Sequence, residues 1–281
     1  MVFHVLNRGV VRRLLFTKDQ DFLAFERVVE ETLRTRRMRV CAYCLMPNHW
    51  HFVVWPERDG DLPAFMQQVT NTHVKRWKEH RHEIGYGHLY QGRYKCFPVE
   101  TEDYFYQVVR YVEQDARRAN LVERAESWRW SSLRRVECED PAFPILSTWP
   151  LPRPTDWLQL VNQPQTEAEV AALRCCVNRG RPFGHPYWVT DTAKRLGLEW
   201  TIRPRGRPKK QSLACHSYLY YLYSPDLVAV TFSALAKPCT SSGIPTGTDR
   251  AAGPWLAPQI EGITPATKKV TYQPEARARV R

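Results

Sequence analysis

Residues 46–55 read MPNHWHFVVW, and this stretch organises the predictions for the whole chain. It opens with a proline–asparagine turn signal and continues as a run of β-branched and aromatic residues, which predicts a strand. Successive side chains of a strand point to opposite faces, so His49 and His51 share one face while Trp50 points to the other. Two imidazoles about 7 Å apart on one strand can both reach a single divalent metal. The alternative is one hydrogen-bonded core histidine and one surface histidine.

The segments around this strand have the periodicities of an α+β domain. Apolar residues recur with helical spacing in some segments and form extended runs in others. Strands are predicted at residues 3–6, 39–46 and 89–99, and helices at 19–37, from 61 onward and at 101–120. Asp61 is a candidate N-cap, and Pro98 marks an end or an edge of its strand. This order predicts a ferredoxin-like α+β fold, an antiparallel sheet with helices on one face.

The remainder of the chain divides by composition. Residues 136–165 are rich in proline and predict a linker after a first domain at 1–135. Residues 166–210 contain helical patterns at 166–177 and 189–196 and end in a basic run, so they predict a small basic extension. Residues 211–281 are expected to be a disordered tail. Its apolar stretch at 218–236 is interrupted by a Pro-Asp pair, which argues against a membrane span.

Charge and cysteine usage point to a partner and a compartment. The formal net charge is +12 and the pI is near 9.4, which predicts a polyanionic partner, although binding to a ribosome or a membrane surface would give the same value. The start of the chain has no signal-peptide pattern, so we expect a reduced, cytoplasmic protein associated with the nucleoid. Cys41 and Cys44 form a C-x-x-C pair, but residues three apart on a strand face opposite ways. They are predicted to be structural thiols.

The helix predicted at 101–120 carries a candidate nucleophile. Tyr111 falls at one edge of the apolar face, with Asp115 one turn further on. A phenol has a pKa of about 10 and attacks poorly at neutral pH, unless a nearby metal polarises and orients the phosphate. Asp115 could supply an oxygen ligand beside His49 and His51, a set that suits Mg²⁺ or Mn²⁺ and does not exclude Zn²⁺. Helix geometry alone does not separate Tyr111 from Tyr104, and either could be an ordinary boundary residue.

Basic and aromatic residues elsewhere predict contacts with DNA. Arginines that follow the first strand could bind phosphates, and a tyrosine on the last strand could stack on a base. The run RPRGRPKK at 203–210 resembles the core of an AT-hook. The predicted DNA-binding residues are Arg8, Arg12, Arg13, Arg93, Tyr94, Lys95, Arg205, Arg207 and Lys209. The alternatives are a solvated charged surface for the strands and plain disorder for the basic run. His80 and His82 end a helix, where residues two apart cannot share a metal.

Five segments together resemble the single-tyrosine HUH transposases, and most closely the REP-associated tyrosine transposases. They are NRG at 7–9, CLMPNHWHFVV at 44–54, GHLYQGRYK at 87–95, RYVEQDARRANLV at 110–122 and WRWSS at 128–132. The resemblance covers residues 2–135 and reaches about residue 210 through NRGRPFG and the second basic run. It implies an enzyme that cleaves and rejoins single-stranded or hairpin DNA.

The resemblance also assigns roles to residues. His49 and His51 match the metal-binding pair, and Tyr111 matches the nucleophile that forms a covalent 5′-phosphotyrosine. Asp115 stands where relatives have Asn or Gln as the third residue of the metal site, which keeps an oxygen ligand and adds a negative charge. Two other readings stay open: a nuclease that activates water, and a DNA-binding relative without catalysis. Relatives include monomers and homodimers, and both are possible for this chain.

Overall fold

The chain folds around a four-stranded antiparallel sheet with strand order β2-β3-β1-β4. The strands are β1 (Val2–Arg8), β2 (Arg39–Met46), β3 (His49–Trp55) and β4 (Lys95–Val99). The computed structural model describes residues 1–138, 145–204 and 206. Helix α1 (Asp19–Thr35) connects β1 to β2, and α2 (Asp61–His80) connects β3 to β4. This connectivity and strand order confirm the predicted ferredoxin-like fold.

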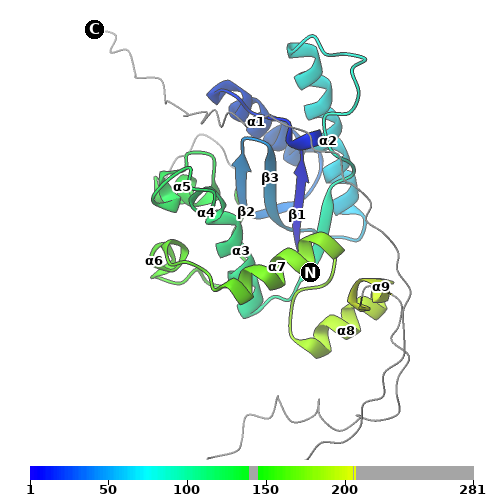
Figure 1. Ribbon diagram of the computed structural model, residues 1–281, viewed down its shortest axis with the longest axis vertical. Coiled ribbons are helices and arrows are strands. Elements are labelled where there is room, and N and C mark those ends of the chain that lie inside the picture. The colour runs from blue at the N-terminus through cyan, green and yellow to red at the C-terminus, as the bar shows by residue number, and fades with distance from the viewer. Residues whose placement is uncertain (139–144, 205, 207–281) are drawn as a thin grey trace, which may run out of the picture. The chain divides into compact units, whose positions relative to one another are not determined.

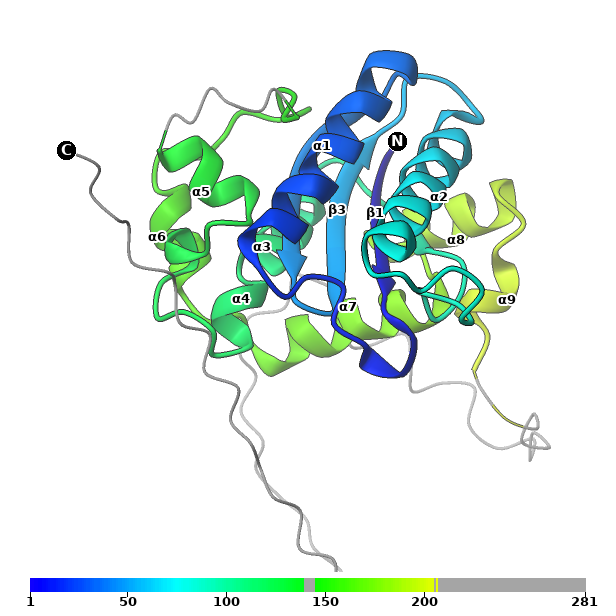
Figure 2. The same ribbon diagram turned by 90° about the horizontal axis from the view of Figure 1, so that it is seen from above.

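Helices cover both faces of the sheet, whereas the sequence predicted them on one face (Figure 1). Helices α1 and α2 lie together over one face, and α3 (Asp103–Glu113) packs against β2 and β3 from the other (Figure 2). The third predicted helix accounts for the difference. It divides at Gln114 into α3 and the short α4 (Asp115–Arg118), and both contact β2.

The alternation along β3 decides what each face contains. Trp50 and Phe52 are buried on the side of α1, where the ring centroid of Trp50 lies 5.9 Å from that of Phe25. Cross-strand partners in a register point to the same side, and β3 pairs His49 with Arg8 and His51 with Leu6 of β1. The histidines therefore point to the face that α3 and α4 cover.

The starts of α2 and β4 differ from the prediction. Asp61 is the first helical residue of α2 and not its N-cap, because Gly60 takes the capping position at φ +90°, a left-handed conformation that favours glycine. Strand β4 begins at Lys95 instead of near residue 89. The side chain of Asn7 donates a hydrogen bond to the carbonyl of Gly92, and the preceding residues form a loop.

The described residues after β4 and α4 form short helices. These are α5 (Ser132–Glu137), α6 (Trp157–Asn162), α7 (Glu167–Arg179), α8 (Pro186–Arg195) and α9 (Glu199–Ile202), with 3-10 turns at Val10–Arg12 and Ala125–Ser127. Helix α7 begins at a capping box made by Thr166 and Glu169 and ends at Gly180, which is left-handed at φ +69°. Among the described residues, no helix has the length and hydrophobicity that crossing a membrane requires.

Residues 149–165, which we call the strap, run along the outer side of α3 and are held there by hydrogen bonds. The hydroxyl of Tyr106 donates to the carbonyl of Pro152 over 2.6 Å, and the Gln114 amide donates to the carbonyl of Val161 over 2.8 Å. Trp157 is buried and its indole donates to the carboxylate of Glu113 over 2.8 Å. This packed segment lies within the range that composition predicts as a linker.

The structure groups the residues from Met1 to Lys210 in one compact unit. The domain boundaries at 135 and 165 therefore stay predictions about how function divides along the chain. The predicted DNA contacts of Arg205, Arg207 and Lys209, and the predicted disordered tail at 211–281, lie outside the described residues.

Candidate active site

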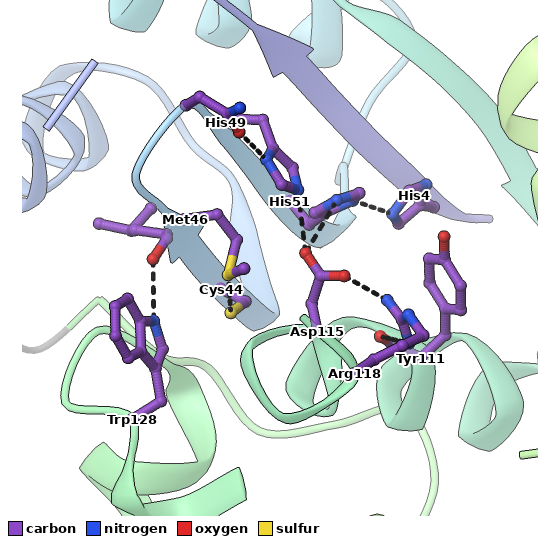
Figure 3. A network of polar contacts seen from close by, with 11 residues as sticks. His4, Cys44, Met46, His49, His51, Tyr111, Asp115, Arg118 and Trp128 are labelled. Atoms are coloured by element: carbon purple, nitrogen blue, oxygen red, sulfur yellow. Dashed lines mark hydrogen bonds and ion pairs between the residues drawn. The ribbon is translucent and has the colours of Figure 1, made fainter. Parts of the chain in front are cut away.

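His49, His51 and Asp115 meet at one point on the sheet face that α3 and α4 cover (Figure 3). The Nε2 atom of His49 lies 2.9 Å from Oδ2 of Asp115, and Nε2 of His51 lies 3.5 Å from the same oxygen. One possible ligand atom from each residue falls within 4.8 Å of the others. Strand β3 supplies both imidazoles, and the first residue of α4 supplies the carboxylate, so the division at Gln114 sets the position of Asp115.

Each histidine has a second partner that fixes its ring. Nδ1 of His49 lies 2.6 Å from the side-chain oxygen of Asn48. Nδ1 of His51 lies 2.9 Å from Nε2 of His4, a fully buried residue of β1. Burial lowers the pKa of His4 to about 3 and lowers that of His51 as well, so both rings are neutral at physiological pH.

Asp115 is ionised, and its charge is balanced. Burial acts to raise the pKa of this carboxyl, but the hydrogen bond with His49 and the charge of Arg118 outweigh it and hold the pKa below its ordinary value. The guanidinium of Arg118 forms an ion pair with Oδ1 of Asp115. The extra negative charge that Asp115 brings, compared with an amide side chain, is therefore offset by a residue one turn away.

Tyr111 lies beside the same histidines. Its ring centroid is 6.2 Å from that of His51 and 6.3 Å from that of His4, and the guanidinium carbon of Arg118 stacks over the ring at 3.9 Å. The side chain is buried rather than at the margin of the helix, with 7% of its surface exposed. Burial raises the pKa of Tyr111, and the charges of Arg118 and Arg174 oppose that rise.

The other tyrosines of α3 point elsewhere, which separates Tyr111 from its alternatives. Tyr104 packs against Phe183, with ring centroids 5.3 Å apart, and Tyr106 bonds to the strap. Of the three tyrosines of α3, Tyr111 is the one whose ring lies beside His51 and His4.

The donor set fits a divalent metal. Two imidazoles and one carboxylate converge, and no other group of three histidine, cysteine, aspartate or glutamate side chains in the described part of the chain is arranged to hold an ion. Cys41 and Cys44 are buried thiols, and burial raises the pKa of both.

Two of the predicted DNA contacts lie on the histidine face of the sheet. Arg8 pairs with His49 across β1 and β3, and Lys95 of β4 pairs with Leu6, the neighbour of His51. Nε of Arg8 is buried and has no hydrogen-bond partner among the described residues. Arg12 is further away, exposed in the 3-10 turn after β1. Arg13 stacks on Trp77 and pairs with Glu83 over 2.6 Å, so it is already engaged.

Arg93 and Tyr94 lie in the loop before β4, whereas the sequence predicted them on the strand. Both residues line a groove beside α2. The groove has a volume of about 1190 Å³ and is also lined by Lys75 and Lys78. The groove lies on the Trp50 side of β3, opposite the histidines. Tyr90 lines this groove and accepts a hydrogen bond from the indole of Trp50 over 3.0 Å. The structure thus separates Arg93 and Tyr94 from Arg8 and Lys95.

Sequence reasoning missed His4, Arg118 and Asn48. His4 gave one signal, since it is the one polar residue in the apolar run predicted as the first strand. Arg118 follows Asp115 by three positions on a helix, a spacing at which opposite charges pair.

A ferredoxin-like sheet that carries a histidine pair, a carboxylate and a tyrosine at one point could hold a divalent cation beside a hydroxyl group. Residues 1–115 match the family model described as "Transposase IS200 like". The matched segment contains His49, His51, Tyr111 and Asp115.

Two solved structures are similar to parts of the chain. One is a REP-associated tyrosine transposase bound to a REP hairpin, with 17% sequence identity and a TM-score of 0.42 over 55% of this chain and 88% of that one. The other is a candidate transposase from Deinococcus radiodurans R1, with 16% identity and a TM-score of 0.32 over 40% of this chain and 88% of that one. No curated protein matches the chain.

Proposed function

We propose that this transposase cleaves and rejoins single-stranded or hairpin DNA through a covalent 5′-phosphotyrosine on Tyr111, with Mg²⁺ or Mn²⁺ as cofactor. The observation that carries the proposal is the meeting of Tyr111 with the His49, His51 and Asp115 cluster in one site. The family match over residues 1–115 supports a transposase, and the geometry of these four side chains motivates the chemistry.

In the proposed reaction, the hydroxyl oxygen of Tyr111 attacks a phosphorus atom of the DNA backbone. The bond from this oxygen to phosphorus forms and the bond from phosphorus to the 3′ oxygen breaks, while the phenol proton passes through solvent to the departing 3′ oxygen. A metal held by His49, His51 and Asp115 would polarise the phosphate. Rejoining is the reverse, with a 3′-hydroxyl as the attacking group.

Neighbouring residues of the chain orient the side chains that would take part in this step. His4 and Asn48 each hold one imidazole so that its Nε2 atom faces Asp115. Arg118 stacks on the ring of Tyr111 while it pairs with Asp115, so one guanidinium ties the nucleophile to the metal ligand. Positioning the nucleophile lowers the activation barrier, by roughly 7–11 kcal/mol in well-oriented intramolecular reactions.

Binding of DNA is proposed at two places. Arg8 and Lys95 beside the histidines would bind phosphates at the cleaved strand, and Arg93 and Tyr94 would bind DNA in the groove beside α2. The similar solved structure that holds a REP hairpin motivates hairpin DNA as the first substrate to test.

The test is a denaturing-gel assay with hairpin DNA taken from beside the gene. With a 3′ label, the DNA becomes attached to the protein if a 5′-phosphotyrosine forms, and with a 5′ label it is released with a free 3′-hydroxyl. We expect a labelled protein band in the presence of Mn²⁺ or Mg²⁺ and none with Tyr111→Phe or His49→Ala. Tyr104→Phe, on the same helix and packed against Phe183, is the matched control and should form the adduct.

Two other results would identify the alternatives. Cleavage that survives Tyr111→Phe would show that water is the nucleophile, and the enzyme would then be a metal-dependent nuclease. Binding of the hairpin with neither cleavage nor an adduct would show a DNA-binding protein that lacks catalysis.

A further inference from the structure

Two neighbouring surface loops hold an unusual share of the exposed apolar side chains. They are residues 9–14, which follow β1, and residues 83–88, which follow α2, and we call them the paired loops. Large apolar side chains are exposed at nine positions in the part of the chain that the structure describes, and four of the nine lie in the paired loops. These four are Val11, Leu14, Ile84 and Tyr86. Single exposed apolar residues are ordinary, but a cluster of them marks an interaction surface.

The first of the paired loops is also held in a strained backbone conformation. Val11 and Arg12 have φ angles of +49° and +58°, in the left-handed region, and no other two consecutive non-glycine residues among those described share this property. A β-branched residue is disfavoured there, because its side chain crowds the backbone. The side chain of Val11 is nevertheless 92% exposed, so packing within the protein does not account for the strain. Strained residues of this kind cluster where ligands bind.

The paired loops are joined to each other by specific contacts. The guanidinium of Arg13 pairs with one carboxylate oxygen of Glu83 over 2.6 Å and hydrogen-bonds to the other over 3.2 Å. The backbone nitrogen of Val10 donates to the carbonyl of Leu89, just after the second loop, over 2.9 Å. A Cβ atom at Gly9 would lie 2.2 Å from the carbonyl oxygen of Arg13, so the first loop closes too tightly for a larger residue there. The exposed side chains are therefore presented on a fixed frame.

The paired loops connect the two places proposed to bind DNA. The backbone nitrogen of Gly9 donates over 2.9 Å to the carbonyl of Asn48, whose side chain contacts the ring of His49. At the other end, Gly87 and His88 of the second loop line the groove beside α2. A DNA strand that extends from the metal cluster to the groove would therefore pass over the paired loops.

The charge of the paired loops favours nucleic acid as the partner. Arg12 is exposed and forms no ion pair with any residue in the described ranges. Glu83 is the one acidic residue of the two loops, and Arg13 neutralises it. Bases offer flat faces for stacking and phosphates bind arginine, so exposed aromatic and aliphatic side chains beside an arginine without an acidic partner match unpaired DNA.

We propose that the paired loops are a stacking platform for unpaired bases of the DNA, next to the phosphate that Tyr111 is proposed to attack. Tyr86 stacks on one base, Val11 packs against a second base, and Arg12 binds a backbone phosphate. The inference rests on the proposed function and deepens it, because it names the part of the DNA that is bound outside the metal cluster. No covalent bond changes in this contact.

The test measures binding, so it does not depend on cleavage. Fluorescent hairpin oligonucleotides with a single-stranded foot are prepared in which one base of the foot at a time is removed to leave an abasic site. The dissociation constant of each is measured by fluorescence anisotropy with wild type and with Tyr86→Ala, and the four values at each position form a double-mutant cycle. Tyr86 is 70% exposed, so its substitution should leave the melting temperature unchanged.

We expect at least one position of the foot at which the abasic site weakens wild-type binding by about fivefold to a hundredfold, as loss of a base stacked on an aromatic ring does. At that position Tyr86→Ala should bind the intact and the abasic DNA equally, and Tyr86→Phe should behave as wild type because it keeps the ring. Tyr187→Ala, at an exposed tyrosine of α8, is the matched control and should also behave as wild type. Equal losses for wild type and Tyr86→Ala at every position would overturn the proposal.

Val11 provides a second measurement, in which stability and binding respond differently. Glycine adopts the left-handed conformation without strain, so Val11→Gly should raise the melting temperature or leave it unchanged. The same substitution should weaken binding of the intact hairpin, because the apolar contact is lost. Val11→Leu keeps an apolar side chain and should retain the affinity. Wild-type affinity in Val11→Gly would overturn the contact assigned to Val11.

Three further outcomes separate the stacking platform from the parent proposal and from another partner. An adduct on Tyr111 without coupling at Tyr86 would overturn the platform alone. Coupling without any adduct would support the platform and overturn the strand-transfer proposal. A wild-type dimer in analytical ultracentrifugation that Tyr86→Ala converts to a monomer would show that a second copy of the chain covers the paired loops instead of DNA.

Discussion

The seven residues of strand β3 present two sides with opposite environments, one apolar and one polar. On one side, Trp50 and Phe52 lie against α1 in an apolar layer, and Phe25 packs directly on Trp50. On the other side, His49 and His51 face a carboxylate and need partners from three separate parts of the chain. An apolar layer accepts any well-fitting neighbour, whereas a buried polar layer requires a specific donor or acceptor for each atom.

The contrast teaches where stability and reactivity reside. Substitutions on the apolar side should cost folding free energy, and substitutions on the polar side should cost chemistry with a smaller effect on folding. Four experiments examine this division.

The largest effect on stability is expected at Trp50. Trp50→Ala removes a fully buried side chain and its hydrogen bond to Tyr90, and we expect a loss of about 3–5 kcal/mol in the free energy of unfolding. Urea unfolding followed by tryptophan fluorescence or circular dichroism measures it. Trp200→Ala, at a position that is 62% exposed, serves as the control and should lie close to wild type. A loss below about 1 kcal/mol at Trp50 would show that the two sides are not divided in this way.

His51→Ala should reverse the pattern. Removal of a metal ligand is expected to lower adduct formation by at least about a hundredfold, since even second-layer partners of metal ligands cost 10–100-fold when removed. The free energy of unfolding should fall by less than it does for Trp50→Ala. The single-turnover rate of adduct formation and a parallel urea titration give both numbers. His82→Ala, an exposed histidine, should change neither, and equal stability losses for His51 and Trp50 would contradict the comparison.

A pH effect of intermediate size is expected from His73, on the apolar side. This ring is buried against the hydroxyl of Tyr90 at 2.6 Å, and burial lowers its pKa from 6.5 to about 3. Between these values the unfolded chain binds a proton that the folded chain does not, so stability falls as pH falls, by about 1.4 kcal/mol per pH unit. His73→Gln should make the dependence of unfolding free energy on pH shallower by that amount between about pH 4 and pH 6. An unchanged slope would show that His73 is protonated in the folded protein.

The smallest effect concerns the groove on the Trp50 side. Arg93→Ala should remove about one phosphate contact, which lowers the slope of log Kd against log salt by roughly 0.7 for a single strand. Anisotropy titrations at several salt concentrations measure the slope. Arg37→Ala, at another exposed arginine, is the control for loss of charge alone. If both variants have the wild-type slope, the groove does not bind DNA phosphates.

Much of the fold could be predicted from local pattern. The bounds predicted for β2 are those of the structure, because its β-branched and aromatic run has clear ends. The shared face of His49 and His51 follows from strand alternation, which holds wherever a strand forms. Asp115 and Tyr111 were chosen through a resemblance and a helix repeat, and the structure brings both to the histidines.

Local pattern cannot report long-range packing. Proline-rich composition predicts a linker at 136–165, and it does not reveal that the indole groups of Trp149 and Trp157 in this range donate to the carbonyl of Cys41 and the carboxylate of Glu113, far away in the sequence. A strand was predicted from residue 89, but the structure has a loop before Lys95, where the side chain of Asn7 donates a hydrogen bond to the carbonyl of Gly92.

The strap has a consequence for whether two inactive variants can restore each other's activity when they are mixed. It binds α3 through side chains on either side of Tyr111, including Tyr106 and Gln114, and so holds the proposed nucleophile beside the histidines of its own chain. If α3 were exchanged with a second copy of the chain, these hydrogen bonds would have to break first. Two inactive proteins, one with Tyr111→Phe and one with His49→Ala, should therefore stay inactive when mixed, because neither can donate its intact half to the other.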